Sequence, residues 1–373
     1  MAGLYVHIPF CATRCSYCGF YSTTKLDLQD RYVDSLCREI ALRKEYLSSY
    51  STDSKAANTI IRTIYIGGGT PSQLSRYSLE KLFHAIDTYL ECSPEEVTME
   101  VNPDDVTNDL AETISALHIN RVSMGAQTFD DNRLKFLNRR HKSFQVERAI
   151  DILHEHGVGN ISIDLMFGFP GQTCDSWKED VRRAISLDIQ HISAYSLIIE
   201  EGTPFYEKYG EGERAEARRR RELPDEDTER LMYQFTKNIL QNYGYHRYEI
   251  SNYAKEGYEC RHNLGYWNRT EYLGIGTGAA SLINNQRFVE GGEIEVLTPQ
   301  NQMEEYMFLG LRRIKGISKA DFRRTFGRSV ENVYGKVLIH MYQKQLLEDT
   351  GDNIRLTEKG IDVSNYVMSE FLF

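Results

Sequence analysis

Six short apolar runs alternate along the chain with longer segments whose apolar residues recur every three or four positions. The runs begin near residues 4, 63, 97, 121, 161 and 191. Runs that are apolar nearly throughout indicate strands buried on both faces, whereas the longer period indicates amphipathic helices. The alternation predicts an α/β fold with βαβ units around a parallel sheet. Six such strands fit an incomplete (β/α)6 barrel better than a closed eightfold one, and a doubly wound open sheet is the alternative.

The pattern changes twice after the sixth run. A strongly charged stretch at 211–230 predicts a mobile segment as far as Leu223, followed by a helix that Asp225 caps. From about residue 300, short helices precede a strand pair and a last helix, which is the order of a winged-helix module. We therefore expect three parts: a partial barrel at 1–210, a barrel extension at 211–299 and a winged-helix-like domain at 300–373.

Composition narrows the class of protein. Of the 373 residues, 41% are apolar and 26% are charged, as in ordinary soluble globular proteins. The net charge of -10 argues against broad binding to nucleic-acid phosphates, so we expect the C-terminal part to be a packing domain and no nucleic acid to be a partner. No apolar run approaches the length of a membrane span, and the first ten residues lack the basic start of a signal peptide. These features predict a cytoplasmic protein.

Three of the seven cysteines form one CxxxCxxC cluster, Cys11, Cys15 and Cys18, directly after the first predicted strand. In a reducing compartment such a cluster indicates metal or redox chemistry more than disulfides. A structural zinc site would need a fourth ligand, for which His7 is the candidate, and this spacing is unusual for zinc. Three thiolates suit a [4Fe–4S] cluster, because they leave one iron open to a substrate or a cofactor.

Other chemically suggestive residues lie where the predicted strands end. They are the glycines at 67–69, Glu100, Gln127 and Asp164. In an α/β barrel the ligand-binding loops gather at these strand ends. A buried carboxylate is costly without a partner, so Asp164 indicates either a ligand site or a hydrogen bond to a neighbouring loop. The glycines indicate either a close approach to a ligand or a simple turn.

The segment CATRCSYC resembles the cysteine motif of the radical S-adenosylmethionine (SAM) superfamily, including the aromatic Tyr17 before the third cysteine. The resemblance implies a [4Fe–4S] cluster on the three cysteines and SAM on the open iron. It also implies an electron donor, since reduction of the cluster drives the cleavage of SAM to a 5′-deoxyadenosyl radical.

Further segments narrow the resemblance to the HemN/HemW group of this superfamily. They cover most of the chain and include YVHIPFC, GGGTPS, EVNPD, RVSMGAQTF, LNRRH and IDLMFGFPGQT. By this resemblance, eight residues are expected to contact SAM: Tyr5, Gly68, Gly69, Thr70, Glu100, Gln127, Arg139 and Asp164.

The group contains an oxygen-independent coproporphyrinogen III oxidase and a heme-chaperone branch. The oxidase pattern has a fourth cysteine where this chain has Phe20, and it has a long segment before the position of Tyr5. The segment HNLGYW at 262–267 matches the HNxxYW motif of the chaperone branch. The resemblance therefore implies a chaperone that passes heme to an acceptor protein and lacks coproporphyrinogen oxidase activity. The alternatives are the oxidase, another radical SAM enzyme acting on a porphyrin, and a metal-stabilised structural protein.

His262 is the expected heme ligand, because a neutral imidazole is a common axial donor to heme iron. Cys260 is a candidate second ligand, and the aromatic rings of Tyr266 and Trp267 suit a porphyrin face or edge. The alternative is that His262 forms a hydrogen-bonding corner and that the aromatic pair belongs to the core. Whether SAM is cleaved, whether the protein forms a homodimer, and whether an acceptor brings it to a membrane surface all stay open.

Overall fold

The computed structural model describes residues 2–46 and 60–372. Twelve strands in this part of the chain form one sheet, in the order β12-β11-β10-β9-β1-β2-β3-β4-β5-β6-β8-β7. The six central strands are parallel and confirm the six predicted from apolar runs. They are β1 (Ala2–Ile8), β2 (Ile61–Gly68), β3 (Cys92–Val101), β4 (Arg121–Gln127), β5 (Ile161–Phe167) and β6 (His191–Ser196).

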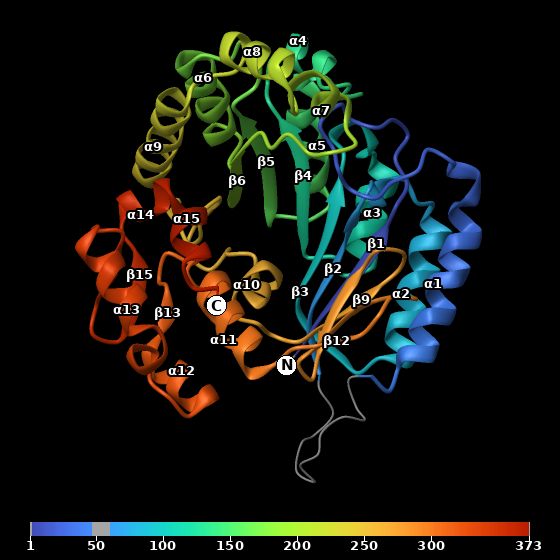
Figure 1. Cartoon of the computed structure of the whole chain (residues 1–373). Helices are drawn as coiled ribbons and strands as arrows, with labels where there is room; N and C mark the ends of the chain where they lie inside the picture. Colours follow the sequence, from blue (N-terminus) through green and yellow to red (C-terminus); the bar gives the residue numbers. More distant parts are fainter. Residues whose placement is uncertain (1, 47–59, 373) are drawn as a thin grey trace.

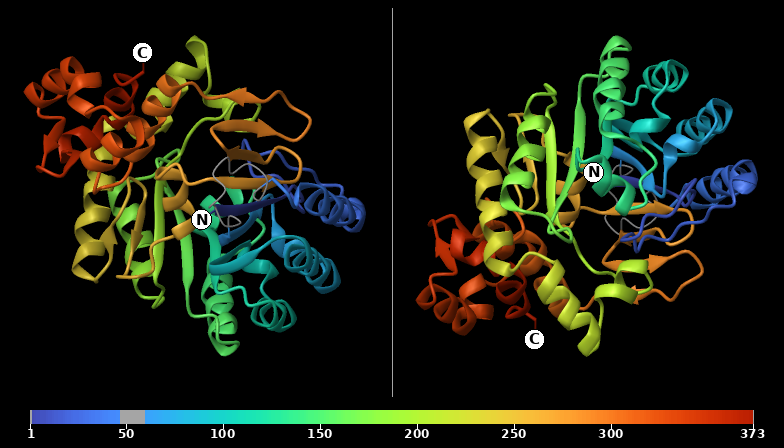
Figure 2. Two further views of the ribbon diagram at one scale, coloured as in Figure 1. Left: turned by 90° about the horizontal axis from the view of Figure 1, so that it is seen from below. Right: turned by 90° about the horizontal axis from the view of Figure 1, so that it is seen from above.

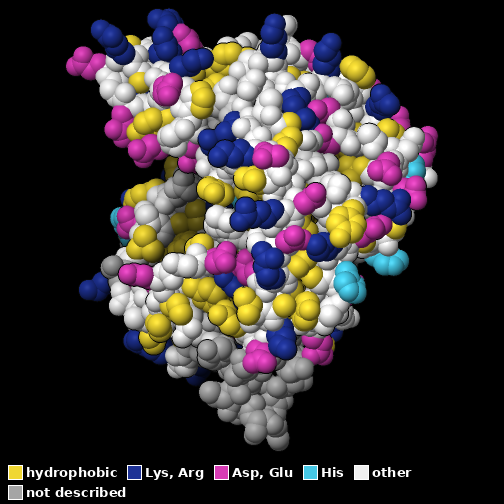
Figure 3. Space-filling model, turned by 90° about the vertical axis from the view of Figure 1, so that its right-hand side faces the viewer, with side chains coloured by type: hydrophobic (Ala, Val, Ile, Leu, Met, Phe, Trp, Pro, Cys, Tyr) yellow, Lys and Arg dark blue, Asp and Glu magenta, His cyan; other side chains and the backbone are white. Residues whose placement is uncertain are grey.

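Amphipathic helices cover the outer face of this curved sheet, and the sheet does not close into a barrel (Figures 1 and 2). The predicted incomplete barrel is therefore confirmed. The covering helices are α1 (Gln29–Arg43), α2 (Arg76–Tyr89), α3 (Asn108–Ala116), α4 (Asp131–Phe136), α5 (Ser143–Glu155), α6 (Cys174–Ile185) and α9 (Glu226–Asn242). Figure 3 shows a recess with hydrophobic walls at its left edge, on the side that faces the viewer in Figure 1.

Short strands from the region after residue 240 extend the sheet at both edges. One edge gains a strand that is parallel to β1, followed by three antiparallel strands; the other gains two antiparallel strands beside β6. They are β7 (His246–Arg247), β8 (Asn252–Ala254), β9 (Tyr272–Ile275), β10 (Ala280–Ile283), β11 (Gln286–Val289) and β12 (Glu295–Val296). The predicted extension at 211–299 thus contributes strands to both sides of the barrel.

The charged stretch is helical where we predicted a mobile segment, so that prediction was wrong. The helix α8 (Glu213–Glu222) covers most of the segment, and the short helix α7 (Pro204–Tyr209) precedes it. Arg219 of α8 donates a 2.9 Å hydrogen bond to the carbonyl oxygen of Tyr209, and ion pairs form one turn apart within the helix. Alternating charges at that spacing support a helix. The predicted cap is confirmed, since the side chain of Asp225 accepts the Thr228 N–H at 2.8 Å.

The C-terminal region has a hydrophobic core of its own, built from buried residues between Met307 and Phe371. A three-stranded sheet of order β13-β15-β14 lies among its helices, which confirms the predicted strand pair and last helix. The elements are α11 (Pro299–Gly310), β13 (Ile317–Ser318), α12 (Lys319–Phe326), α13 (Val330–Gln343), β14 (Leu347–Asp349), β15 (Asn353–Leu356), α14 (Glu358–Asp362) and α15 (Ser364–Ser369). No helix in the described part of the chain is long and apolar enough to cross a membrane.

Candidate functional site

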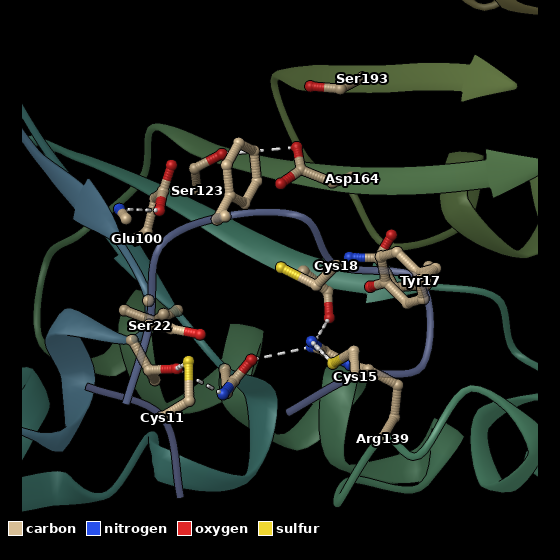
Figure 4. Close-up of a pocket in the computed structure, with 18 of the residues that line it drawn as sticks. Cys11, Cys15, Tyr17, Cys18, Ser22, Glu100, Ser123, Arg139, Asp164 and Ser193 are labelled. Atoms are coloured by element: carbon tan, nitrogen blue, oxygen red, sulfur yellow. Dashed lines mark hydrogen bonds between the residues drawn. The ribbon is translucent and has the colours of Figure 1, made fainter. Parts of the chain in front are cut away.

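The three clustered cysteines lie on the loop that follows β1, at the upper end of the barrel in Figure 1. Backbone hydrogen bonds fix this loop: the Cys11 N–H donates to the Thr23 carbonyl at 3.0 Å, and the Ser16 N–H donates to the Leu137 carbonyl at 3.0 Å. Cys11, Cys15 and Cys18 line one pocket, and Figure 4 shows their sulfur atoms turned toward the same space.

Polar side chains from neighbouring elements reach two of these sulfur atoms. The Thr70 hydroxyl donates to Cys11 Sγ at 3.4 Å, and Arg139 Nη1 donates to Cys15 Sγ at 3.6 Å. Burial raises the pKa of the Cys11 and Cys18 thiols, so their thiolates need compensating positive charge. Three half-buried thiols with hydrogen-bond donors at two of them fit the ligand set of an iron–sulfur cluster, since donors to ligand sulfur stabilise it.

The glycine run at the end of β2 brings that strand close to the cysteine loop. Gly68 has φ of +112°, and a Cβ there would lie 2.5 Å from the ring of His7. A Cβ on Gly69 would lie 2.8 Å from the carbonyl oxygen of Phe10. Because only glycine tolerates this packing, both residues are explained by backbone geometry. Gly68, Gly69 and Thr70 all line the pocket, and their contact with SAM stays a prediction.

Glu100, at the end of β3, carries the best-defined carboxylate of the pocket. It accepts a 2.8 Å hydrogen bond from the Tyr65 hydroxyl and a 3.0 Å bond from the Gly68 N–H (Figure 4 shows the second). Burial is the main cause that raises the pKa of Glu100 to about 7, and the charge of Asp164 adds to the rise. A carboxyl poised near neutral pH is characteristic of functional sites.

The other predicted SAM contacts converge on the same pocket with one exception. Arg139 donates to the Asn102 side chain at 2.8 Å, and Asp164 lies 3.5 Å from the Ser123 hydroxyl. Gln127 is buried with φ of +66°, a conformation that is uncommon outside glycine. Tyr5 is the exception, because it is absent from the pocket lining and its hydroxyl lies 3.0 Å from His7 Nδ1.

Several residues that line the pocket were not singled out from the sequence, although Arg121, Ser123 and Asn263 stand within motifs quoted above. They are Tyr65, Arg121, Ser123, Ser193, Tyr195 and Asn263. In β4 a usable signal was present, since the inward positions of RVSMGAQ alternate with apolar ones. Polar or small residues at every second position of a buried strand indicate a polar barrel interior.

The HNLGYW segment forms the short helix α10 (Arg261–Trp267) at the lower end of the barrel in Figure 1. The carboxylate of Glu96, on β3, accepts the Arg261 N–H at 2.9 Å and the His262 N–H at 3.0 Å. Asn263 lines the same pocket as the three cysteines. This helix therefore forms part of the floor of the pocket whose upper end carries the cysteine loop.

The expected heme ligand is enclosed within this floor. His262 is 3% exposed; its Nδ1 lies 2.9 Å from the Thr63 hydroxyl, and its Nε2 lies 2.9 Å from the Tyr266 hydroxyl. Burial lowers the pKa of His262 to about 3, and the charge of Arg121 adds to this effect. The ring is absent from the lining of the cysteine pocket and lines a second pocket below it, together with Tyr266 and Tyr272.

Cys260 is buried next to the same carboxylate. Its sulfur lies 3.6 Å from Glu96 Oε1, and burial raises the pKa of this thiol to about 12. The thiol is therefore protonated at neutral pH and donates to Glu96. This arrangement explains Cys260 as a structural partner of the α10 helix start.

Comparisons with known proteins agree with this architecture. Residues 5–184 match the family model of the radical SAM superfamily, and residues 297–363 match the HemN C-terminal domain. The structure of coproporphyrinogen III oxidase (HemN) from Escherichia coli, which is described as a radical SAM enzyme, superimposes with a TM-score of 0.81 at 20% identity. The match covers 100% of this chain and 90% of that one. The fold and the site thus define a radical SAM protein, a class whose cofactors are a [4Fe–4S] cluster and SAM.

Similar curated proteins show to which family of this superfamily the chain belongs. The heme chaperone HemW of Bacillus subtilis (strain 168) is 37% identical, and the alignment covers 100% of this chain and 99% of that protein. HemW of Lactococcus lactis subsp. lactis (strain IL1403) is 36% identical, over 99% of this chain and 96% of its own length. The chain belongs to the HemW family, which confirms the predicted resemblance.

Proposed function

We propose that this protein is a heme chaperone that binds heme and passes it to an acceptor protein. Similarity over the whole chain to proteins named heme chaperone HemW, at up to 37% identity, is the observation that carries the proposal. The floor helix with the HNLGYW segment supports it, because it sets the imidazole of His262 beside the ring of Tyr266, with 4.9 Å between the ring centroids. The Trp267 ring lies apart from this pair, against the guanidinium of Arg312. The proposal includes an electron donor for the cluster and a cytoplasmic location.

For the cofactors, we propose that Cys11, Cys15 and Cys18 hold the cluster. SAM would then lie in the pocket against the glycine loop, where its ammonium and sulfonium groups find the carboxylates of Glu100 and Asp164. When bound, the cluster and SAM supply electron-driven cleavage of the sulfonium. The chain itself contributes hydrogen bonds to the sulfur atoms and a carboxylate, that of Glu100, fixed by the Gly68 N–H. The other proposed SAM contacts in the pocket are Gly68, Gly69, Thr70, Gln127 and Arg139. Tyr5 is also proposed as a contact, although it lies outside the pocket lining, with its hydroxyl 3.0 Å from His7 Nδ1.

His262 is the proposed heme ligand. Ligation at Nε2 requires the Tyr266 hydroxyl to leave, since both ring nitrogens are engaged in hydrogen bonds. A neutral ring favours this role, because heme iron binds the unprotonated nitrogen. His262→Ala is therefore expected to shift the heme absorption maximum or to weaken binding. An unchanged spectrum and affinity would mean that another residue binds the heme iron, and the chaperone proposal would still stand.

The function is tested by anaerobic reconstitution with iron and sulfide, followed by heme titration and transfer to apomyoglobin as a model acceptor. We expect saturable heme binding and a transfer rate that exceeds the spontaneous rate from free heme. Cluster-free protein serves as the comparison for transfer, and heat-unfolded protein controls for adsorption of heme to apolar surface. Failure of the reconstituted protein to bind heme saturably would contradict the proposal.

The second candidate function is oxidation of coproporphyrinogen III, because the chain shares the fold of the E. coli oxidase. We predict that this activity is absent. Phe20 stands where the oxidase pattern has its extra cysteine, and its ring is 68% exposed at the lining of the pocket. An anaerobic assay with reductant, SAM and coproporphyrinogen III tests the prediction. Protoporphyrinogen formed over many turnovers would overturn it and restore the oxidase function.

A further inference from the structure

Arg121 is a fully buried guanidinium without a partner on the floor of the cysteine pocket. It is the first residue of β4, is 2% exposed and lines the pocket. Its Nε and Nη1 atoms are buried without a hydrogen-bond acceptor, and in the described part of the chain the side chain forms neither a hydrogen bond nor an ion pair. An uncompensated buried cation is costly, so its presence requires an explanation.

The buried Arg43 and the partly buried Arg139 show the ordinary arrangement. Arg43 pairs with Glu39 at 3.0 Å and donates to the Gly274 carbonyl at 2.8 Å. Arg139 lines the same pocket as Arg121 but donates to the Asn102 side chain and to the Gly125 carbonyl, at 2.8 and 2.5 Å. Both of these guanidinium groups thus have polar partners in the protein, although Nε of Arg139 is also unpaired, whereas neither Nε nor Nη1 of Arg121 has an acceptor.

The acidic residues around Arg121 do not supply the missing partner. Desolvation acts to lower the pKa of Arg121, and the groups that raise it most are Cys260 and then Glu96. The Cys260 thiol is neutral at pH 7, and the Glu96 carboxylate already accepts the two N–H groups at the start of α10. Glu100 is engaged by Tyr65 and Gly68. Asp164 lies beside Ser123. In the described part of the chain, none of these carboxylates forms an ion pair with Arg121 within 4.0 Å.

We propose that Arg121 binds a carboxylate of the ligand that fills the lower part of the pocket. The planar fork of a guanidinium matches a carboxylate in a bidentate pair, and a buried site without competing water makes that pair strong. This inference rests on the proposed function, because both of its organic ligands carry carboxylates. Heme has two propionates and SAM has one amino-acid carboxylate, so the shared chemistry defines the site and the experiment identifies the source.

The test uses the full chain and three variants: Arg121→Met, Arg121→Lys and, as a buried but paired control, Arg43→Met. Affinities are measured for heme, for heme dimethyl ester, whose propionates are uncharged, and for SAM with the reconstituted cluster. Thermal midpoints are measured without ligands. We expect Arg121→Met to weaken the binding of heme or of SAM by roughly ten- to a hundredfold, as for loss of a charge-assisted pair. Arg121→Lys should retain the fold but lose much of this affinity, because an ammonium lacks the planar fork.

The thermal midpoints separate a ligand site from a structural charge. Removing a cation that has no protein partner should leave the midpoint unchanged or raise it, whereas Arg43→Met should lower it and leave the ligand affinities unchanged. If heme is the source, wild type prefers heme to its dimethyl ester and Arg121→Met abolishes this preference. A loss confined to SAM identifies the SAM carboxylate instead.

Two results would overturn the inference. One is a lowered midpoint of Arg121→Met, or failure of that variant to fold, together with unchanged ligand affinities in Arg121→Lys. The other is a stable Arg121→Met protein that binds heme, its ester and SAM as wild type does. Wild-type protein that binds no heme at all would refute the proposed function separately, and the SAM measurements would still decide the role of Arg121.

Discussion

The affinity for SAM should rise with pH, because the proposed site contains a carboxyl that is largely protonated in slightly acidic solution. Burial raises the pKa of Glu100 to about 7 from its ordinary value of 4.5. SAM carries a sulfonium and an ammonium group, and these pair with the ionised carboxylate and not with the neutral acid. Binding below the pKa must therefore release a proton, and that release costs affinity.

The size of the effect follows from the pKa. With a pKa of about 7, the ionised fraction of Glu100 grows from roughly one eleventh at pH 6 to roughly ten elevenths at pH 8, a tenfold gain worth about 1.4 kcal/mol. Stability without ligand changes in the opposite direction. Because the pKa of Glu100 is higher in the folded than in the unfolded state, this carboxyl lowers the stability of the empty protein as pH rises from about 4.5 to about 7.

Anaerobic calorimetric titration of the reconstituted protein with SAM, from pH 6 to pH 8, measures both the affinity and the protons released. Glu100→Gln should weaken binding and flatten most of the pH dependence, with any residual slope assigned to Asp164, whose pKa burial also raises. Glu229→Gln is the matched control, since burial raises the pKa of Glu229 but this residue is not part of the pocket lining. An unchanged slope in Glu100→Gln would refute the reasoning.

Three further predictions follow from the same contacts. Alanine at any one of the three cluster cysteines should remove most of about four irons per chain, measured by iron analysis, whereas Cys37→Ala should retain them. Tyr65→Phe leaves Glu100 without one donor and should weaken SAM binding about five- to tenfold by calorimetry, with heme binding unchanged. Glu96→Ala leaves two N–H groups of α10 unpaired and should lower the unfolding free energy by about 2–4 kcal/mol in urea.

The central fold could be predicted because strands buried on both faces show in the sequence as uninterrupted apolar runs. The strands added at the two edges of the sheet are too short to give such runs, and they were not predicted. β9 has four residues and pairs with β1, which lies more than 260 residues earlier in the chain. No hydrophobic periodicity in the neighbouring sequence therefore indicates this strand. The α8 helix was missed for a different reason. Its composition is nearly all charged, and its order depends on ion pairs and on contacts to α7 that a hydrophobic pattern does not contain.

The candidate site divides in the same way. Residues that end strands or stand in a dense motif, such as Cys11 and Glu100, were recognisable from the sequence. Tyr65 and Arg121 were not, because neither stands at the carboxyl end of its strand, and their place in the site depends on how the strands bring their inward side chains together. Backbone geometry also accounts for part of what the motifs suggested, since Gly68 and Gly69 are required by packing against β1 whether or not a ligand is present.

The floor of the barrel constrains how heme could bind to His262. Thr63 holds Nδ1 from the strand side, whereas Tyr266 holds Nε2 from the pocket below α10, so the phenol of Tyr266 is the group that heme iron would displace. Breaking the hydrogen bond between Tyr266 and His262 would cost about 1 kcal/mol of net stabilisation. The iron–imidazole bond would more than offset this cost. Since the pKa of His262 is about 3, the ring stays neutral throughout the physiological range. Any change of heme affinity between pH 5 and pH 8 must therefore arise from groups other than this imidazole, such as the carboxylates above it.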